Sequence, residues 1–299
     1  MPKVSVIIPL YNGESYIREA IQSVFSQTFQ DFEVVVIDDG STDRGKEIIL
    51  GMQGPIGYFY QQNSGVTTAR NQGFLNSSGD FIAFLDQDDR WYPEKLEIQA
   101  RLLNQQPEIG IVYSDIDLID EAGHVLERKH LTNQTQPAGK KDAVFSAIRA
   151  EYPDPHPFPS TVMMRREIFA TAGMFDPAFK KNCYEDKELW FRIVKKKLGQ
   201  FFFIPEPLVQ RRCHPFQGER NQEARDENWD IYWRKVSEHL DDRVKAGLNR
   251  KIARILSREG HDLITKGDFE RGRMYLKKSF RYEVFSWKNF SRLIRSYLP

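Results

Sequence analysis

The chain lacks the features that mark secreted and membrane-spanning proteins. Its 299 residues include 2 cysteines, Cys183 and Cys213, so we expect reduced thiols and no disulfide framework. No segment approaches the ~20 apolar residues that a membrane-spanning helix requires. Met1-Pro2-Lys3 leads directly into an apolar run, which leaves no room for the hydrophobic region of a signal peptide. We therefore expect a cytoplasmic protein.

A large net charge is absent as well, because 43 Lys and Arg nearly balance 42 Asp and Glu. The charge is uneven, however. From Arg243 onward, fifteen Lys and Arg stand against five Asp and Glu, so this segment carries +10 and the remainder −9. Such a basic segment fits either contact with an anionic surface, such as a membrane or a polyanionic substrate, or an ordinary solvated helical face. No nucleic-acid partner is expected.

The first half of the chain alternates strand and helix patterns. Strands are predicted at residues 4–10, 33–37, 58–61, 80–85 and 109–119. Helices are predicted at residues 14–27, 66–76 and 93–106, with a weaker one ending near residue 52. This order predicts an α/β fold with a Rossmann-like, mostly parallel sheet flanked by helices. Ligands of such sheets bind at the carboxyl ends of the strands.

The second half is less regular. Residues 131–159 are polar and rich in proline, with one predicted helix at 141–150, as is typical of functional loops. Strands are predicted at residues 160–165, 201–204 and 208–212, and helices at 185–197, 219–239, 248–266, 269–281 and 287–297. We predict a catalytic domain over residues 1–218, with a nucleotide-binding half (1–120) and an acceptor half (121–218), and a helical C-terminal extension over 219–299.

Three carboxylates follow the apolar run at residues 79–85 directly, in the sequence Asp86-Gln87-Asp88-Asp89. Carboxylates this close raise one another's pKa unless a cation lies among them. Oxygen ligands of this kind suit Mg²⁺ or Mn²⁺, which commonly bind phosphate as well. The cluster indicates either a metal site for a nucleotide diphosphate or a surface turn that starts the next helix.

Polar clusters also follow the first two predicted strands. They are Pro9-Leu10-Tyr11-Asn12-Gly13-Glu14 and Asp38-Asp39-Gly40-Ser41-Thr42-Asp43. Turns of this composition present carboxylates and backbone amides to a ligand, although each is also a good start for a helix. Arg70, near the start of the helix at 66–76, can reach phosphate oxygens or be an ordinary surface cation.

Taken together, these motifs resemble those of the inverting glycosyltransferases of family 2, which share the GT-A fold. The matching segments are residues 4–12, 36–43, 69–73, 82–89, and 173–176 followed by 184–192. The resemblance spans roughly residues 3–215, and five blocks in the correct order make it specific.

The resemblance implies that the first two turns bind the donor nucleotide, with Asp39 on uracil. The residues concerned are Pro9, Tyr11, Asn12, Glu14, Asp39 and Ser41. Arg70 is placed near the diphosphate, and Asp86 faces the ribose or the metal. Asp88 becomes the direct ligand of Mn²⁺ or Mg²⁺, whereas Asp89 is expected to cap the next helix.

The same resemblance makes Asp186 the catalytic base, which takes the proton of an acceptor hydroxyl group as its oxygen attacks the anomeric carbon. Adjacent helical residues point about 100° apart, so only one of these two acids can face the site. Glu185 would therefore orient this base or bind the acceptor. The alternative is that both acids only favour a helix N-terminus. His214 corresponds to a histidine that contacts metal or diphosphate in many relatives, unless it is structural.

We therefore predict a metal-dependent, inverting glycosyltransferase of polysaccharide or glycoconjugate biosynthesis. It would move a sugar from a nucleotide-diphosphate donor, a UDP-sugar, to a hydroxyl group of a glycan or lipid-linked acceptor. The basic C-terminal helices would allow peripheral contact with an anionic membrane. One alternative is a catalytically silent nucleotide-sugar-binding or scaffold protein with the same fold. Another, a nucleotidyltransferase, is disfavoured because Tyr11-Asn12-Gly13-Glu14 is not a basic, glycine-rich loop.

Overall fold

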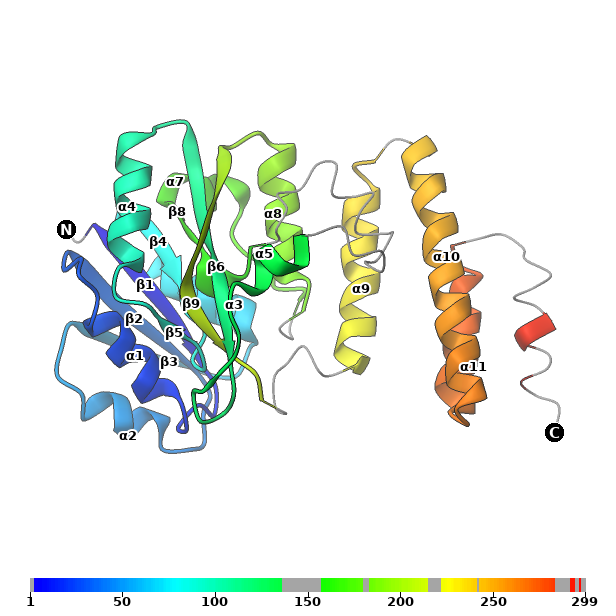
Figure 1. Ribbon diagram of the computed structural model, residues 1–299, viewed down its shortest axis with the longest axis horizontal. Coiled ribbons are helices and arrows are strands. Elements are labelled where there is room, and N and C mark those ends of the chain that lie inside the picture. Colours follow the sequence, from blue (N-terminus) through cyan, green and yellow to red (C-terminus); the bar gives the residue numbers. More distant parts are fainter. Residues whose placement is uncertain are drawn as a thin grey trace. The chain divides into compact units, whose positions relative to one another are not determined.

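The computed structural model describes residues 3–135, 157–179, 183–214, 222–240, 242–282, 291–293 and 296 (Figure 1). This part of the chain forms two compact units. The first extends to Lys235, and the second begins at Val236. The predicted helix at residues 141–150 lies outside the described residues, as does most of the one at 287–297. The predicted domain limits stay a prediction.

The first unit is built on a mixed sheet. Among the described residues it has nine strands, in the order β3-β2-β1-β4-β8-β6-β9-β5, with β7 paired to β6. The strands are β1 (Val4–Leu10), β2 (Phe32–Asp39), β3 (Ile56–Gln61), β4 (Phe81–Phe84), β5 (Arg90–Trp91), β6 (Ile109–Ile119), β7 (Val125–Glu127), β8 (Met163–Arg165) and β9 (Gln200–Arg212). The strands from β3 to β4 are parallel to one another, as predicted for this half.

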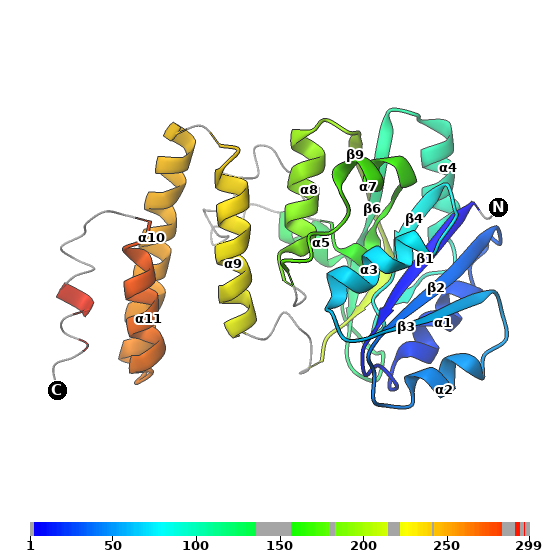
Figure 2. The same cartoon turned by 180° about the vertical axis from the view of Figure 1, so that it is seen from behind.

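Helices cover both faces of this sheet (Figures 1 and 2). The helices of the first unit are α1 (Ile17–Phe25), α2 (Gly45–Leu50), α3 (Val66–Leu75), α4 (Lys95–Gln105), α5 (His130–Thr135), α7 (Arg166–Ala172), α8 (Glu185–Lys195) and most of α9 (Gln222–Ser237). The helices α1, α2 and α4 contribute to one apolar cluster, and α3, α7 and α8 to the other.

The alternation of side chains along a strand produces these two clusters. In β1, Val6 and Ile8 belong to the cluster on the α1 side, whereas Ile7 belongs to the cluster on the α3 side. Successive side chains of a strand point to opposite faces, so a strand covered on both faces must be apolar throughout. All seven residues of β1 are buried accordingly.

Two predictions for the acceptor half were wrong in detail. Residues 201–204 and 208–212 form one strand, β9, because its pairing with β6 shifts register around Asp115, which lies opposite Pro207. The shift accommodates prolines, which cannot donate to a regular ladder. Residues 159–161 form a 3₁₀ turn that begins with a proline, so the strand predicted at 160–165 is limited to β8.

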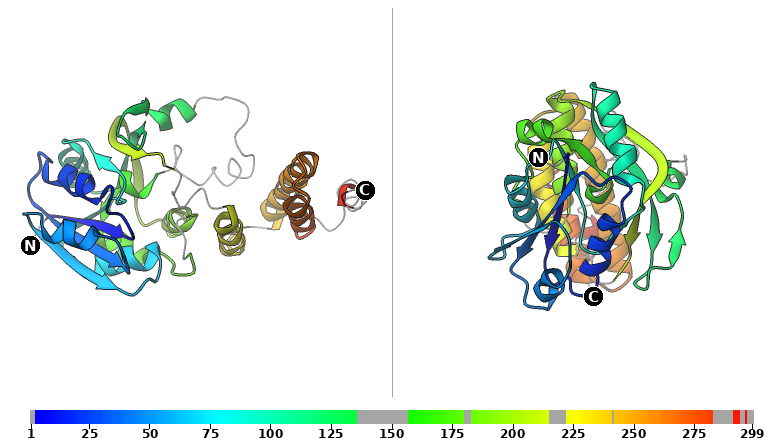
Figure 3. Two further views of the ribbon diagram at one scale, coloured as in Figure 1. Left: turned by 90° about the horizontal axis from the view of Figure 1, so that it is seen from below. Right: turned by 90° about the vertical axis from the view of Figure 1, so that its left-hand side faces the viewer.

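The second unit contains α10 (Asp242–Thr265) and α11 (Phe269–Ser279), which run side by side (Figure 3). A Cβ on Gly260 would lie 2.8 Å from the carbonyl oxygen of Gly272, so two glycines let the helix backbones approach closely. The predicted break at Gly267-Asp268 is confirmed, with φ of +86° at Gly267. Within the described part of the chain, no helix combines the length and apolar character needed to cross a membrane.

Candidate active site

The segments that follow β1, β2 and β4 meet at one edge of the sheet. β1 pairs in parallel with both neighbours, with Leu10 opposite Asp38 and Ile7 opposite Phe84. Since parallel strands place their carboxyl ends together, the clusters predicted after the first, second and fourth strands come into contact. Pro9 lies within buried β1 itself, just before this edge.

The first two clusters are joined by hydrogen bonds. Asn12 has a left-handed backbone with φ of 49°, which asparagine adopts more readily than most residues. Its backbone N–H donates to Ser41 Oγ (3.0 Å), and its Oδ1 accepts from the backbone N–H of Thr42 (2.8 Å). The Glu14 carboxylate accepts from the backbone N–H of Arg44 (3.0 Å), and this bond lowers the pKa of Glu14.

Gln87 attaches the acidic loop to the first of these turns. Its Oε1 accepts from the backbone N–H of Tyr11 (2.8 Å), and its Nε2 donates to the Tyr11 carbonyl oxygen (3.1 Å). A Cβ at Gly13 would lie 2.6 Å from the Gln87 side chain, so only glycine fits there without movement. Sequence reasoning gave Gln87 no role, because a glutamine in a surface turn carries no signal.

Asp39 accepts three hydrogen bonds within the protein. Its Oδ1 accepts from Gln61 Nε2 (2.7 Å) and the backbone N–H of Ser64 (2.8 Å), and its Oδ2 from the backbone N–H of Gly65 (2.8 Å). The carboxylate is buried and connects the end of β2 to the start of α3. It therefore organises the loop that precedes Arg70.

The acidic loop is a crowded group of carboxylates. Burial raises the pKa of Asp86, an effect that Arg70 opposes and the charge of Asp88 reinforces. Burial, followed by the charges of its two neighbours, raises the pKa of Asp89 well above its ordinary value. Asp89 does not cap the next helix as predicted, because its Oδ1 accepts from the backbone N–H of Arg212 in β9 (3.0 Å) and α4 begins only at Lys95.

His214 lies against Asp88, with 2.8 Å between Nε2 and Oδ2. The imidazole is nearly buried and its ring centroid lies 5.4 Å from that of Tyr16. Its Nδ1 is buried and has no hydrogen-bond partner among the described residues. His214 and Asp88, two of the predicted metal ligands, are therefore in direct contact.

Asp88 and His214 thus offer one oxygen and one nitrogen donor to a cation. Among the described residues, no group of three or more His, Cys, Asp and Glu side chains is placed to hold a metal ion. Mg²⁺ in nucleotide sites commonly takes one or two protein ligands and completes its shell with phosphate and water. The donor set therefore fits an ion that arrives with a nucleotide, and it does not form an all-protein cage.

Arg70 is fully buried and links the acidic loop to α8. Its two terminal nitrogens donate to Asp86 Oδ1 (2.6 Å) and to Glu185 Oε1 (2.9 Å). Nothing in the sequence indicated this bridge, since Arg70 and Glu185 are 115 positions apart.

Glu185 and Asp186 form the first turn of α8, directly after Tyr184, whose φ is 69°. Both acids are buried, Glu185 almost completely. Burial, followed by the charge of Asp186, raises the pKa of Glu185 to about 8. The Asp186 Oδ1 accepts from the backbone N–H of Lys187 (2.7 Å). Glu185, the neighbour of the predicted base, is thus joined to the acidic loop through Arg70.

Two further residues support the acidic loop and were missed by sequence reasoning. Ser160 Oγ accepts from the backbone N–H of Asp86 (3.1 Å). Arg212, fully buried, donates from Nε to the Asp88 carbonyl oxygen (3.0 Å) and from a terminal nitrogen to the carbonyl oxygen of Glu121 (2.7 Å). For Arg212, the only hint in the sequence was the pair of adjacent arginines at residues 211–212. The sequence does not show which of the two is buried.

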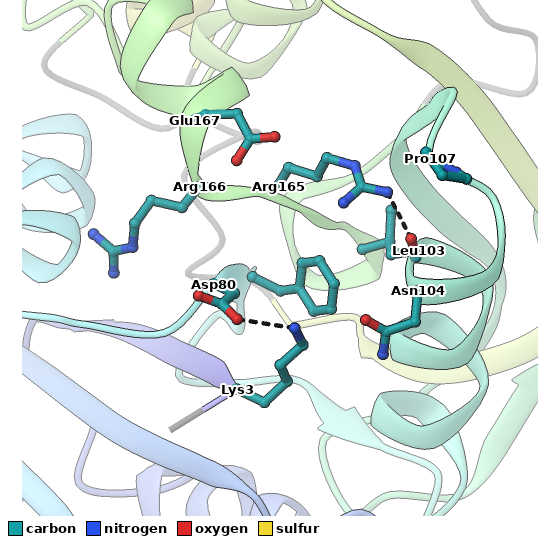
Figure 4. Close-up of a pocket in the computed structure, with 9 residues that line it drawn as sticks. Lys3, Asp80, Leu103, Asn104, Pro107, Arg165, Arg166 and Glu167 are labelled. Carbon is teal, nitrogen blue, oxygen red and sulfur yellow. Dashed lines mark hydrogen bonds and ion pairs between the residues drawn. The ribbon is translucent and has the colours of Figure 1, made fainter. Parts of the chain in front are cut away.

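A pocket of about 410 Å³ lies at the opposite end of the sheet (Figure 4). It is lined by the residues before β1 and β4 and by those at the junction of β8 and α7. Three of its charged groups are engaged within the protein: Lys3 pairs with Asp80 (2.9 Å), and Arg165 donates to the Leu103 carbonyl oxygen (2.6 Å). The pocket lies away from the acidic loop, so we assign it no part in the site.

Known proteins resemble this chain in sequence. Residues 5–172 match the family described as "Glycosyl transferase family 2". An uncharacterized glycosyltransferase of Rickettsia typhi is 33% identical over 233 residues, 78% of this chain and 70% of the relative. Another, of Rickettsia prowazekii, is 31% identical over 268 residues, 87% of this chain and 81% of the relative. A relative of Rickettsia felis is matched over 38% of its length, so this chain spans little more than a third of it.

The fold is that of a solved structure, residues 1–349 of S. aureus TarS. The complex with UDP has a TM-score of 0.63 at 18% identity, over 99% of this chain and 89% of that chain. The complex with UDP-GlcNAc has a TM-score of 0.64 at 17% identity. The predicted GT-A fold is confirmed by this likeness, which at such low identity concerns the fold alone.

Proposed function

The chain belongs to glycosyl transferase family 2 and is a glycosyltransferase, and we propose that it moves a sugar from a UDP-linked donor with inversion at the anomeric carbon. We propose a hydroxyl group of a glycan or lipid-linked sugar as the acceptor. The TarS complexes with UDP and UDP-GlcNAc support this donor class. One observation carries the proposal: Arg70 joins Asp86 to Glu185 and so brings carboxylates of two distant segments to one place.

The donor nucleotide would bind at the edge formed by the turns after β1 and β2. Tyr11 presents a half-exposed ring there, and Asn12 and Ser41 fix the turns against each other. An aromatic face and polar backbone groups suit a nucleoside, whose base stacks and whose ribose accepts and donates hydrogen bonds. This edge would thus recognise the nucleoside, and the acidic loop would lie nearer the diphosphate.

A divalent ion, Mn²⁺ or Mg²⁺, would be held by Asp88 and His214, with Asp86 close by. When bound, it would supply positive charge opposite the departing diphosphate. Two contacts hold the loop that would carry this ion: Gln87 attaches it to Tyr11, and Ser160 Oγ accepts a hydrogen bond from the backbone N–H of Asp86. The crowded carboxylates of the loop favour a cation among them.

Asp186 would act as the base. Its carboxylate would take the proton of the acceptor hydroxyl group while that oxygen forms a bond to the anomeric carbon. The bond from this carbon to the phosphate oxygen breaks on the opposite face, and UDP leaves with its electron pair, which inverts the configuration. The first turn of α8 places Asp186 where the helix N-terminus favours its ionised form.

Calorimetric titration of UDP tests the donor site. We expect binding that requires Mn²⁺, is abolished by chelator and is lost in Asp88→Ala. Asp80→Ala is the matched control, because Asp80 lies at the opposite end of the sheet and should leave UDP binding unchanged. Absence of UDP binding to the wild type in either condition would contradict the proposed donor.

Turnover of a panel of UDP-sugars tests the reaction itself. Asp186→Asn should retain UDP binding and lose turnover by at least about 100-fold, the scale of general-base catalysis. UDP binding without turnover of any donor by the wild type would instead favour a catalytically silent nucleotide-sugar-binding protein with the same fold.

We also propose that the second unit contacts an anionic membrane surface. On α10, Arg250, Arg254 and Arg258 are exposed at helical spacing, whereas Ile252 and Leu256 between them are buried. A row of cations on one helix face is attracted to acidic headgroups by about 1 kcal/mol per residue near the surface. Flotation with vesicles that contain phosphatidylserine should recover the protein, and the triple Arg→Gln variant should not float. Equal recovery with neutral vesicles would contradict the idea.

A further inference from the structure

The fully buried Arg70 has a role that differs from the phosphate contact expected of it. Its side chain is inaccessible to solvent, and both terminal nitrogens are occupied by carboxylates of this chain. An arginine that binds a diphosphate directs those nitrogens at the ligand as a fork. Here the fork spans two protein segments, the loop after β4 and the first turn of α8.

Neighbours of Arg70 in α3 bind the segment at residues 175–179, which precedes α8 in the sequence. Asn71, its neighbour in α3, exchanges two hydrogen bonds with the backbone of Phe175, at 2.8 and 3.0 Å. Thr67 Oγ1 donates to the Phe179 carbonyl oxygen (2.9 Å). The Phe175 ring lies 5.3 Å from the guanidinium carbon. One face of α3 therefore anchors the segment that leads towards α8, and Arg70 reaches past it to α8 itself.

The bridge is costly for the fold. The Nε of Arg70 and the Oε2 of Glu185 are buried and have no hydrogen-bond partner among the residues described. Buried ion pairs of this kind are often replaced by apolar side chains without loss of stability. Stability alone therefore does not explain an incompletely hydrogen-bonded arginine at this point. A need to hold two segments of the chain in position explains it better.

We propose that Arg70 is a positioning residue, which holds the Asp86 loop and the Glu185-Asp186 turn at a fixed separation. The inference rests on the proposed function, because the two segments are those that would carry the metal-bound diphosphate and the catalytic base. Attack and departure occur on opposite faces of one carbon, so the base and the leaving group must be spaced correctly. Arg70 sets that spacing from beneath the site and does not touch the substrate.

The test compares Arg70→Met and Arg70→Lys with the wild type in steady-state kinetics and in binding of UDP and UMP. Misplacement of the base by about 1 Å should lower kcat of Arg70→Met about 100-fold. Arg70→Lys keeps the charge but makes only one of the two contacts, so we expect an intermediate kcat. The affinities for UDP and UMP should change by less than about 3-fold and in the same proportion.

Two controls separate positioning from stability. Arg166→Met removes a different arginine, which is only partly buried, bonds the Gly79 carbonyl oxygen and packs on Phe74. This variant should lower the melting temperature without lowering kcat. In the Glu185→Gln background, Arg70→Met should cost less in kcat than in the wild type, because the bridge is already weakened.

Three outcomes would contradict the positioning role of Arg70. Loss of UDP affinity with UMP affinity unchanged would make Arg70 a phosphate ligand and overturn the inference. Unchanged kcat in Arg70→Met, or a loss no greater than its unfolded fraction explains, would overturn it as well while leaving the proposed function intact. A wild type that turns over no donor would overturn both.

Discussion

The imidazole Nε2 of His214 lies 2.8 Å from the Asp88 carboxylate, although 126 positions separate the two residues. The contact joins the segment after β9 to the loop after β4. It places a nitrogen donor beside Asp88, the carboxylate that the resemblance assigned to the metal. His214, which the resemblance already assigned to metal or diphosphate, thus lies beside the other ligand of the proposed metal site.

His214→Ala should weaken Mn²⁺-dependent UDP binding by at least about 10-fold, because loss of a group that supports a metal site costs at least that much. In chelator, neither the wild type nor His214→Ala should bind UDP. Calorimetric titration at several Mn²⁺ concentrations measures the difference. His124→Ala is the matched control, since His124 is exposed and bonds only Asp120 among the interactions described. Equal metal dependence in the wild type and His214→Ala would contradict the assignment.

Asp39→Ala should destabilise the protein. Three partly buried donors, Gln61 Nε2 and the backbone N–H groups of Ser64 and Gly65, lose their acceptor. The expected loss in the free energy of unfolding is about 1–3 kcal/mol, measured by urea denaturation. Asp31→Ala, at an exposed position just before β2, should stay within about 0.5 kcal/mol of the wild type. A stable Asp39→Ala protein would show that the three bonds are dispensable.

Gly13→Ala should weaken UDP binding about 3- to 10-fold, roughly the loss of one or two hydrogen bonds. The added Cβ would lie 2.6 Å from the Gln87 side chain and displace it from Tyr11. Gly247→Ala serves as a comparison, because an added Cβ there meets nothing within 4 Å in α10 and should slightly stabilise the helix. Unchanged affinity in Gly13→Ala would mean that the Gln87 contact does not shape the nucleotide site.

The stability of the wild type relative to Glu185→Gln should depend on pH. Burial raises the pKa of Glu185 from 4.5 to about 8 against the opposing charge of Arg70, so the folded state holds the proton to a higher pH than the unfolded chain does. That contribution is complete below about pH 4.5 and is lost as the pH rises through about 8, because the unfolded chain releases the proton first. Glu185→Gln should therefore gain melting temperature relative to the wild type between pH 5 and pH 8.

Glu167→Gln is the control for this comparison, because Glu167 is exposed in the first turn of α7. Its melting temperature should follow that of the wild type across the same pH range. A difference between the wild type and Glu185→Gln that stays constant across this range would show that burial does not raise the pKa of Glu185.

The parallel half of the fold was predictable from the sequence because local pattern determines it. β1 and β2 are apolar on both faces, and the polar clusters directly after them must lie at the carboxyl edge. Asp86 and Asp88 followed from the same rule. The continuous β9 was not predictable, because the register shift that passes Pro207 depends on its partner β6.

Roles that depend on contacts between residues far apart in the sequence were not predicted. The sequence shows Arg70 near the start of a helix, where a phosphate contact is a reasonable expectation, but its burial depends on Asp86 and on α8. Asp89 illustrates the same limit: an acid before a helix suggests a cap, yet its partner is the backbone of Arg212 across the sheet. Local propensity gives way to tertiary contacts at such positions.

The turns after β1 and β2 are held to each other by bonds within the protein, which Asn12 makes with Ser41 and Thr42. The conformational entropy of ordering these two turns is therefore lost when the protein folds, and not when the donor arrives. More of the free energy of donor contacts can then appear as affinity. Donor association should accordingly show the small heat-capacity change of a preformed site, without the larger change that accompanies folding coupled to binding.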